Sequence, residues 1–130
     1  MKRKSQNKGK RTSRRRKTRT ALRNKADRLF SAAVRERDDW ACRNCGSVRT
    51  PQCAHIVSRR YNATRWSMDN AVCLCQRCHM KFTHDVLAWE DWVVERFGEE
   101  RYQDLKFRAR QGVASVDLEG IVKMLEGKDE

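Results

Sequence analysis

The stretch Cys42-Arg43-Asn44-Cys45-Gly46, together with Leu74-Cys75-Gln76-Arg77-Cys78-His79, decides the fold of this 130-residue chain. Each stretch holds a pair of cysteines separated by two residues, a spacing that lets both sulfurs point at one tetrahedral ion. Two such pairs are typical of a four-thiolate structural zinc site. Because four thiolates leave no open coordination position, we expect the zinc to stabilise the fold and not to react with a substrate.

The segment between the two pairs is longer than a zinc ribbon needs. It counts 29 residues, whereas ribbon spacings are about 15 to 20. We therefore interpret it as an insertion that carries the chemistry of the protein. Cys53 and Cys73 lie in this segment but have no partner at the two-residue gap, and we predict that both are buried thiols.

Hydrophobic spacing predicts an α+β domain around the cysteine pairs. Apolar residues at intervals of three and four predict helices over residues 21–38, 86–97 and 117–126, and Gly98 is a natural C-cap for the second. Short apolar runs predict strands over residues 53–57 and 70–74, followed by a short helix from residue 76 to about 83. The order across residues 53–84 is thus strand, loop, strand, helix.

Charge is concentrated at the N-terminus. The chain has 30 lysines and arginines against 17 acidic residues, and residues 1–20 hold eleven of these bases and no acid. A segment of this kind has no apolar face to bury, so we predict a disordered basic tail over residues 1–20 that is attracted to a polyanion. A solvated tail that aids solubility or serves as an address signal is the alternative.

The remaining division follows from these elements: a domain over residues 21–112 and a C-terminal helical segment over residues 113–130. No run of about 20 apolar residues predicts a membrane span, and no apolar stretch after the basic start resembles a signal peptide. We therefore expect no membrane partner and a cytoplasmic protein, where reduced cysteines favour metal ligation.

The three histidines of the chain, His55, His79 and His84, lie within or beside the segment that the cysteine pairs bracket. With His55 on a strand and His79 on a helix packed beside it, the two imidazoles are expected to converge. The pattern Cys42-x-x-Cys45, Ala54-His55-Ile56, Asn70 and Leu74-Cys75-x-x-Cys78-His79 resembles the HNH endonuclease family, over residues 40–84. The likeness is greatest to small HNH proteins of bacteriophages.

The resemblance implies a ββα-metal core on the zinc site and a metal-dependent endonuclease that cuts or nicks DNA. It implies that His55 is the general base, since an imidazole with a pKa near neutrality suits removal of a proton from water. It implies that Asn70 holds the loop between the strands and orients His55 through a carbonyl contact. His79 would bind a catalytic divalent ion, Mg²⁺ or Mn²⁺, because a site with few protein ligands suits ions that keep several waters.

The chain departs from the family pattern at the catalytic ion. Many members carry Asp or His immediately before the general base as a metal ligand, and this chain has Ala54 there. A further ligand is expected one helical turn after His79, where Thr83 lies. His84 lies five residues after His79, rotated by about 140° on a helix, so it ligates only if the helix ends or distorts before it. A surface histidine is the equal alternative.

The loop over residues 58–69 concentrates arginine and aromatic side chains. We predict that Arg59, Arg60 and Arg65 contact DNA phosphates, and that Arg59 or Arg60 also stabilises the transition state. The alternative is that they are ordinary solvated bases. Trp66 is as well suited to the core as to a nucleic-acid surface.

Two other functions fit the same residues. A zinc-stabilised nucleic-acid-binding module without catalysis is the main alternative, and Ala54 is the residue that supports it. An RNA-binding or ribosome-associated protein would use the tail equally well, since phosphate contacts do not distinguish the two polymers. The likeness to phage proteins also adds other phage proteins as partners and a host bacterial cytoplasm as the location, and we expect a monomer or a weak dimer.

Overall fold

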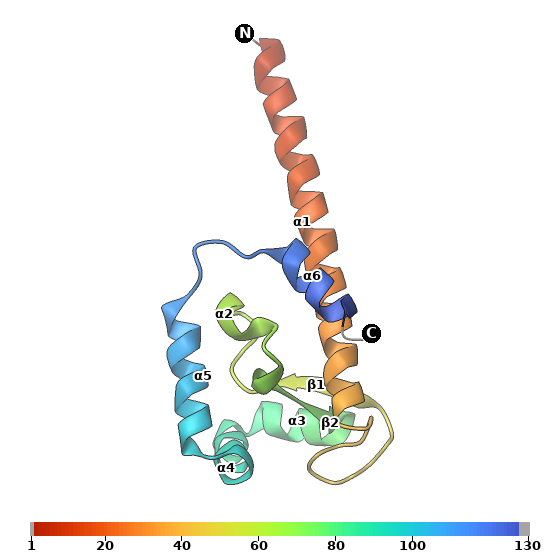
Figure 1. Cartoon of the computed structure of the whole chain (residues 1–130), viewed down its shortest axis with the longest axis vertical. Coiled ribbons are helices and arrows are strands. Elements are labelled where there is room, and N and C mark those ends of the chain that lie inside the picture. Colours follow the sequence, from red (N-terminus) through yellow and green to blue (C-terminus); the bar gives the residue numbers. More distant parts are fainter. Residues whose placement is uncertain (1, 128–130) are drawn as a thin grey trace. The chain divides into compact units, whose positions relative to one another are not determined.

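A computed structural model describes the backbone of residues 2–127 and the side chains of residues 13–127. Most of the chain is helical, and one two-stranded antiparallel sheet supplies the β structure, so the predicted α+β class is confirmed in this coarse form (Figure 1). The elements in chain order are α1 (Lys2–Arg37), β1 (Pro51–His55), α2 (Asn62–Arg65), the 3-10 helix η1 (Met68–Asn70), β2 (Ala71–Cys75), α3 (Gln76–His84), α4 (Val86–Phe97), α5 (Glu99–Gln111) and α6 (Leu118–Glu126).

The chain divides into two compact units. One unit comprises Met1–Leu29 with Asp117–Glu130, and the other comprises Phe30–Val116. In the first unit, α6 lies alongside part of α1 (Figure 1), and Lys25 Nζ contacts Glu126 Oε1 at 2.8 Å. The second unit contains the hairpin, both cysteine pairs and all three histidines.

The sheet is the hairpin of β1 and β2, which pair with Pro51 opposite Cys75 and His55 opposite Ala71. β1 begins and ends two residues earlier than predicted. The amide of Ile56 still donates in register to the carbonyl of Asn70 at 2.8 Å, and backbone pairing ends at Val57, whose amide donates instead to the side-chain Oδ1 of Asn70 at 2.8 Å. Pro51 is tolerated because it is the first residue of its strand.

The two faces of the hairpin carry different residues, because side chains alternate along a strand. Ala54, Val72 and Leu74 lie on the face that packs on α3, in a buried cluster with Phe82. The opposite face carries Cys53 and Cys73, which are cross-strand partners, and His55 opposite Ala71. The C-terminal part of α1 lies on that face, since the rings of Phe30 and His55 stack with their centroids 5.4 Å apart.

Three helices, α3, α4 and α5, follow the hairpin, and α3 and α4 contribute to the apolar cluster on its Ala54 face. Asp85 caps α4 by accepting from the amide of Ala88 at 3.1 Å, and Gly98 ends α4 as predicted, with φ 93°. Trp89 and Trp92 stack at 5.4 Å and both contact Phe82, so the tryptophans belong to the core. α5 continues from Gly98 and packs on α4 and on α2, the helix inside the loop between the strands.

The helix α1 extends further toward the N-terminus than the sequence predicted. The basic segment over residues 1–20, predicted to be disordered because it has no apolar face to bury, has helical backbone from Lys2 and buries none of its described side chains. The segment lacks proline, and lysine, arginine and glutamine are good helix formers, which is the physical reason for a helix there. The side chains of residues 13–20 are all exposed, so no tertiary packing supports this part of the helix.

Candidate functional site

The four cysteines of the two pairs meet at one point, as the spacing predicted. The Sγ atoms of Cys42, Cys45, Cys75 and Cys78 all lie within 4.8 Å of one another. Cys42, Cys75 and Cys78 are buried and Cys45 is exposed. This donor set and its compactness fit a structural Zn²⁺ ion, whose tetrahedral sites take four thiolates.

Backbone geometry brings each pair of sulfurs together. In the first pair, the amide of Cys45 approaches Cys42 Sγ at 3.5 Å, and the amide of Gly46 donates to the carbonyl of Cys42 at 2.8 Å. Gly46 has φ 80°, a backbone conformation that side chains with a Cβ rarely adopt. In the second pair, Cys75 caps α3, and its Sγ accepts from the amide of Cys78 at 3.5 Å.

A side-chain relay supports the sulfur of Cys78 from outside. Asn44 Nδ2 donates to Cys78 Sγ at 3.3 Å, and Trp92 Nε1 donates to Asn44 Oδ1 at 3.1 Å. Trp92 belongs to α4, so this relay connects a core helix to the zinc site. Groups of this kind fix the direction of a metal ligand and tune its affinity.

The thiols differ in how readily they ionise. Burial disfavours the thiolate of Cys42, but hydrogen bonds from backbone amides, first that of Cys45, outweigh it and lower the pKa of Cys42 to about 6. Burial raises the pKa of Cys78 to about 12. A cation held by all four sulfurs would favour the thiolate of each. Outside the site, burial raises the pKa of Cys53 to about 12 and also raises that of Cys73.

His55 lies at the end of β1 in a defined orientation. Its Nε2 lies 2.8 Å from the carbonyl oxygen of Arg65, an acceptor, so Nε2 carries the proton. In the neutral ring, Nδ1 then carries the lone pair. A histidine in this tautomer is arranged to accept a proton at Nδ1.

Asn70 is fully buried and holds the loop between the strands. Its Oδ1 accepts from the amide of Val57 at 2.8 Å, and its Nδ2 donates to the carbonyls of Val57 and Thr64, both at 3.0 Å. Thr64 directly precedes Arg65, whose carbonyl accepts from His55. The asparagine therefore holds the peptide that directly precedes the one whose carbonyl orients the imidazole.

His79 lies in the first half of α3 and is half-buried. Its Nδ1 donates to Gln52 Oε1 at 2.8 Å, and this contact leaves the lone pair of the neutral ring on Nε2. Burial lowers the pKa of His79, which favours the neutral form that binds metals. Gln52 is a residue that the sequence analysis did not single out, and only its place on β1 could have indicated it.

The structure places His55 and His79 on opposite faces of the hairpin. Gln52, the partner of His79, and His55 lie three positions apart on β1, and side chains at odd separations along a strand project to opposite faces. Convergence of the two imidazoles was expected from the sequence. The helix lies where it was predicted, β1 lies two residues earlier, and the action of both rings on one phosphate stays a prediction.

The surroundings of His79 offer few further ligands. Ala54 is buried in the apolar cluster, 2% exposed. Thr83 donates its hydroxyl to the carbonyl of His79 at 2.8 Å. His84 is exposed and ends α3. Within the described part of the chain, the four cysteines are the one group of three or more His, Cys, Asp or Glu ligand atoms close enough to hold an ion, so His79 and His84 form no such group.

The arginines of the loop differ in exposure, since Arg65 is half-buried. Arg59 and Arg60 are exposed. The guanidinium of Arg65 lies over the ring of Trp66 at 5.1 Å, and that of Arg60 lies over Tyr61 at 5.5 Å. Trp66 is buried, so the core alternative was the right one for this residue.

No protein-family model matches the chain, and comparisons with curated proteins and with solved structures find no significant match. In the part of the chain that the structure describes, no helix has the length and apolar character that crossing a membrane requires.

Proposed function

We propose that the chain is an HNH-type endonuclease that hydrolyses a phosphodiester bond in DNA. The observation that supports this most directly is the arrangement of His55, Arg65 and Asn70. A buried asparagine holds the loop, a loop carbonyl accepts from Nε2–H of the histidine, and in this tautomer Nδ1 is the basic nitrogen.

In the proposed reaction, Nδ1 of His55 accepts a proton from a water molecule as the water oxygen forms a bond to phosphorus. The bond from phosphorus to the 3′ oxygen then breaks, and the leaving oxygen takes a proton from solvent. Phe30 stacks on the His55 ring and limits its rotation. Exposed Arg59 and Arg60 would pair with the phosphates that flank the cleaved bond, since a guanidinium matches two phosphate oxygens at once.

A divalent ion such as Mg²⁺ or Mn²⁺ would supply charge stabilisation for the departing oxygen when bound. The described residues offer it one histidine ligand atom, Nε2 of His79, so waters and phosphate oxygens would complete its coordination. This fits ions that keep most of their waters and bind with their substrate. His84 remains a proposed additional ligand, at the exposed end of α3.

A second function is supported by Ala54. Ala54 has no ligand atom where the resemblance leads one to expect an acidic or imidazole ligand beside the general base, and its side chain is buried in the apolar cluster. A zinc-stabilised module that binds DNA without cutting it would need no ion there. The exposed bases of α1 and of the loop would serve such a module equally well.

One experiment separates the two functions. Supercoiled plasmid is incubated with the zinc-loaded protein and Mg²⁺ or Mn²⁺, alongside His55→Ala, His79→Ala and His84→Ala. The endonuclease predicts open-circle or linear product from the wild type, and a loss of about 100-fold or more with His55→Ala, the range for a general base. His84→Ala tests the proposed additional ligand, and Met80→Ala, on an exposed side chain of the same helix, serves as the control.

The result that would overturn the endonuclease is clear. If the wild type shifts the plasmid in a gel at every metal and salt condition and leaves it supercoiled, the binding module is the correct function. Cleavage that survives His55→Ala unchanged would also contradict the proposed role of His55.

A further inference from the structure

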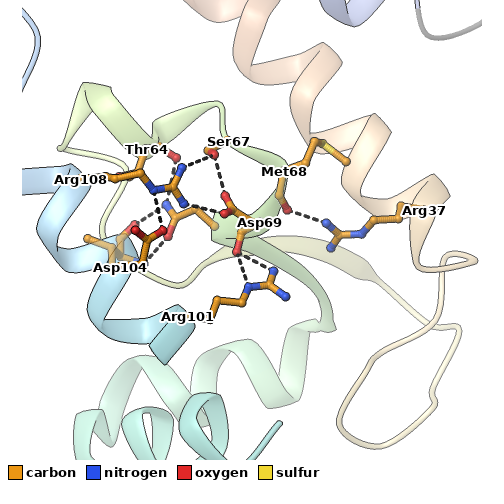
Figure 2. Close-up of polar contacts among 10 residues, drawn as sticks. Arg37, Thr64, Ser67, Met68, Asp69, Arg101, Asp104 and Arg108 are labelled. Atoms are coloured by element: carbon orange, nitrogen blue, oxygen red, sulfur yellow. Dashed lines mark hydrogen bonds and ion pairs between the residues drawn. The ribbon is translucent and has the colours of Figure 1, made fainter. Parts of the chain in front are cut away.

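Three arginines from two helices converge on the residues that immediately precede β2, as Figure 2 shows for Arg37 of α1 and for Arg101 and Arg108 of α5. All three belong to the unit Phe30–Val116. None of them lies in the cysteine pairs or the arginine-rich loop. All three guanidinium groups bind groups of the protein itself.

The contacts are made with carbonyls and with one carboxylate. Arg37 donates from Nη1 to the carbonyl of Met68 at 2.5 Å and from Nη2 to that of Ala71 at 2.7 Å. Arg101 donates from Nε and Nη2 to the carbonyl of Asp69, at 3.2 and 2.7 Å. Arg37 and Arg101 therefore bind the carbonyls of η1 and of the first residue of β2 from two different helices (Figure 2).

The side chain of Asp69 provides the third anchor. Its Oδ2 lies 2.5 Å from Arg108 Nη2, and its Oδ1 accepts from the hydroxyl of Ser67 at 2.6 Å. Arg108 also contacts Ser67 Oγ at 3.3 Å and Asp104 Oδ2 at 3.0 Å (Figure 2). Asp104 lies one helical turn before Arg108 on α5 and so holds the guanidinium in place.

The segment that Arg37 and Arg101 bind contains Asn70. Its backbone follows Asp69, whose carbonyl is held by Arg101, and precedes Ala71, whose carbonyl is held by Arg37. The Asn70 amide in turn fixes Thr64, next to the carbonyl that accepts from His55 Nε2. Hydrogen bonds, joined by the chain steps from Asp69 to Asn70 and from Thr64 to Arg65, thus connect α5 to the imidazole.

We propose that Arg101 and Arg108 are positioning residues for His55, acting through Asp69 and Asn70. This inference rests on the proposed function, because it names the residues that position His55, the general base of that site. It also assigns α5 a role: the helix lies beyond the residues that carry the resemblance, yet it determines the tautomer of the histidine. Arg101 and Arg108 therefore bind groups of the protein itself and do not contact DNA.

The test reads the tautomer of His55 directly. Nitrogen-15 NMR on labelled histidine distinguishes Nε2–H from Nδ1–H, and it is measured at pH 8 on zinc-loaded wild type and on Arg101→Gln/Arg108→Gln. The wild type is expected to show one tautomer, protonated at Nε2, and the double variant a mixture. Arg110→Gln, an exposed arginine on the same helix, is the matched control and should leave the tautomer unchanged.

Two further variants keep the test decisive. Asp69→Asn removes the carboxylate that Ser67 and Arg108 share while leaving every arginine in place, and it serves if the double variant fails to fold. Arg108→Lys keeps the charge and should restore part of the wild-type tautomer ratio. If a folded double variant, or folded Asp69→Asn, retains the wild-type tautomer, the positioning role is overturned.

Cleavage provides the second measurement. The double variant should cut plasmid about 10- to 100-fold more slowly, the range typical of groups that orient a reacting residue, with KM for DNA unchanged. A large rise in KM with kcat unchanged would identify the two arginines as DNA contacts instead and overturn the inference. If the wild type does not cut DNA at all, the endonuclease fails, while a changed tautomer in the double variant still supports the positioning role.

Discussion

Asn70 satisfies three backbone groups of the loop between the strands. It is fully buried, and its amide makes three hydrogen bonds, to the amide and carbonyl of Val57 and to the carbonyl of Thr64. A shorter apolar side chain would leave these three groups without a partner in the interior. Each unsatisfied buried group costs about 1 to 3 kcal/mol.

Asn70→Ala should therefore lower the free energy of unfolding by about 2 to 4 kcal/mol, as expected for loss of a buried network. Urea unfolding of the zinc-loaded protein, followed by circular dichroism, measures the change. Asn62→Ala on exposed α2 is the control and should change stability little. A cost for Asn70→Ala no larger than that of Asn62→Ala would show that the loop keeps its shape without this amide.

Trp92 links a core helix to a zinc ligand through a single indole N–H. Trp92→Phe keeps the aromatic packing on Phe82 and removes the hydrogen bond to Asn44, so Asn44 loses its fixed orientation toward Cys78. Zinc affinity should fall about 10-fold or more, the effect typical of outer-sphere partners. Competition with a chromogenic chelator measures the affinity. Trp40→Phe, on an exposed tryptophan, should leave it unchanged.

At the scale of the elements, the sequence predicted what local spacing encodes. The helices α3 and α4 were located to within a residue, because apolar spacing and Gly98 mark their limits. The convergence of four cysteines followed from the two gaps. The end of β1 was misplaced because Val57 continues the apolar run but donates its amide to the side chain of Asn70, a contact that only the folded loop creates.

The helix α5 was not predicted, although a local signal was present. Tyr102, Leu105 and Ala109 are buried at helical spacing, and the first turn carries Glu99 and Glu100. What the sequence could not give is the destination of its arginines. Which carbonyl a guanidinium reaches depends on how α5 packs against α2 and the loop, which is a property of the tertiary structure.

Tyr102 ties α5 to α4 and makes their contact sensitive to high pH. Its hydroxyl donates to Glu90 Oε1 at 3.0 Å. Burial, together with Glu90, raises the pKa of Tyr102 from the ordinary 10.0 to about 12. Between pH 10 and about 12 the unfolded chain releases this proton while the folded chain retains it, so the contribution of Tyr102 to stability falls as the pH rises.

Tyr102→Phe should therefore lose less stability than the wild type between pH 10 and about 12. Parallel urea titrations at several pH values measure the two slopes. Tyr61→Phe, on an exposed tyrosine, should follow the wild type. Identical slopes for Tyr102→Phe and wild type would mean that the phenol ionises equally well in both states.

At the scale of the whole molecule, zinc and fold should be inseparable in the unit Phe30–Val116. The four sulfurs join the segment after α1 to the end of β2 and the start of α3. Structural zinc contributes about 10 to 16 kcal/mol in small domains, which is comparable with the total stability of a domain, about 5 to 15 kcal/mol. Removal of the ion should therefore unfold this unit.

A chelator, or Cys75→Ser, is expected to abolish cooperative thermal unfolding and most of the helical circular dichroism of residues 30–116. Cys53→Ser is the matched control, because Cys53 lies outside the sulfur group, and it should retain one zinc per chain by metal analysis. A chelated protein that still unfolds cooperatively near the temperature of the zinc-loaded form would show that the hairpin and α3–α5 hold together without the ion.

The basic part of α1 should set how strongly the protein depends on salt for binding DNA, whichever function is correct. Residues 13–20 are exposed and include Arg14, Arg15 and Arg16, which make no packing contribution that substitution would disturb. Replacing these three by glutamine removes up to three phosphate contacts, so the slope of log affinity against log salt should become shallower by up to about 2.7. Fluorescence anisotropy with labelled duplex DNA at several salt concentrations measures it. A variant with residues 13–20 in shuffled order keeps the charge and should keep the wild-type slope. A triple variant with the wild-type slope would place the phosphate contacts elsewhere, with the exposed Arg59 and Arg60 of the loop as the next cations to substitute.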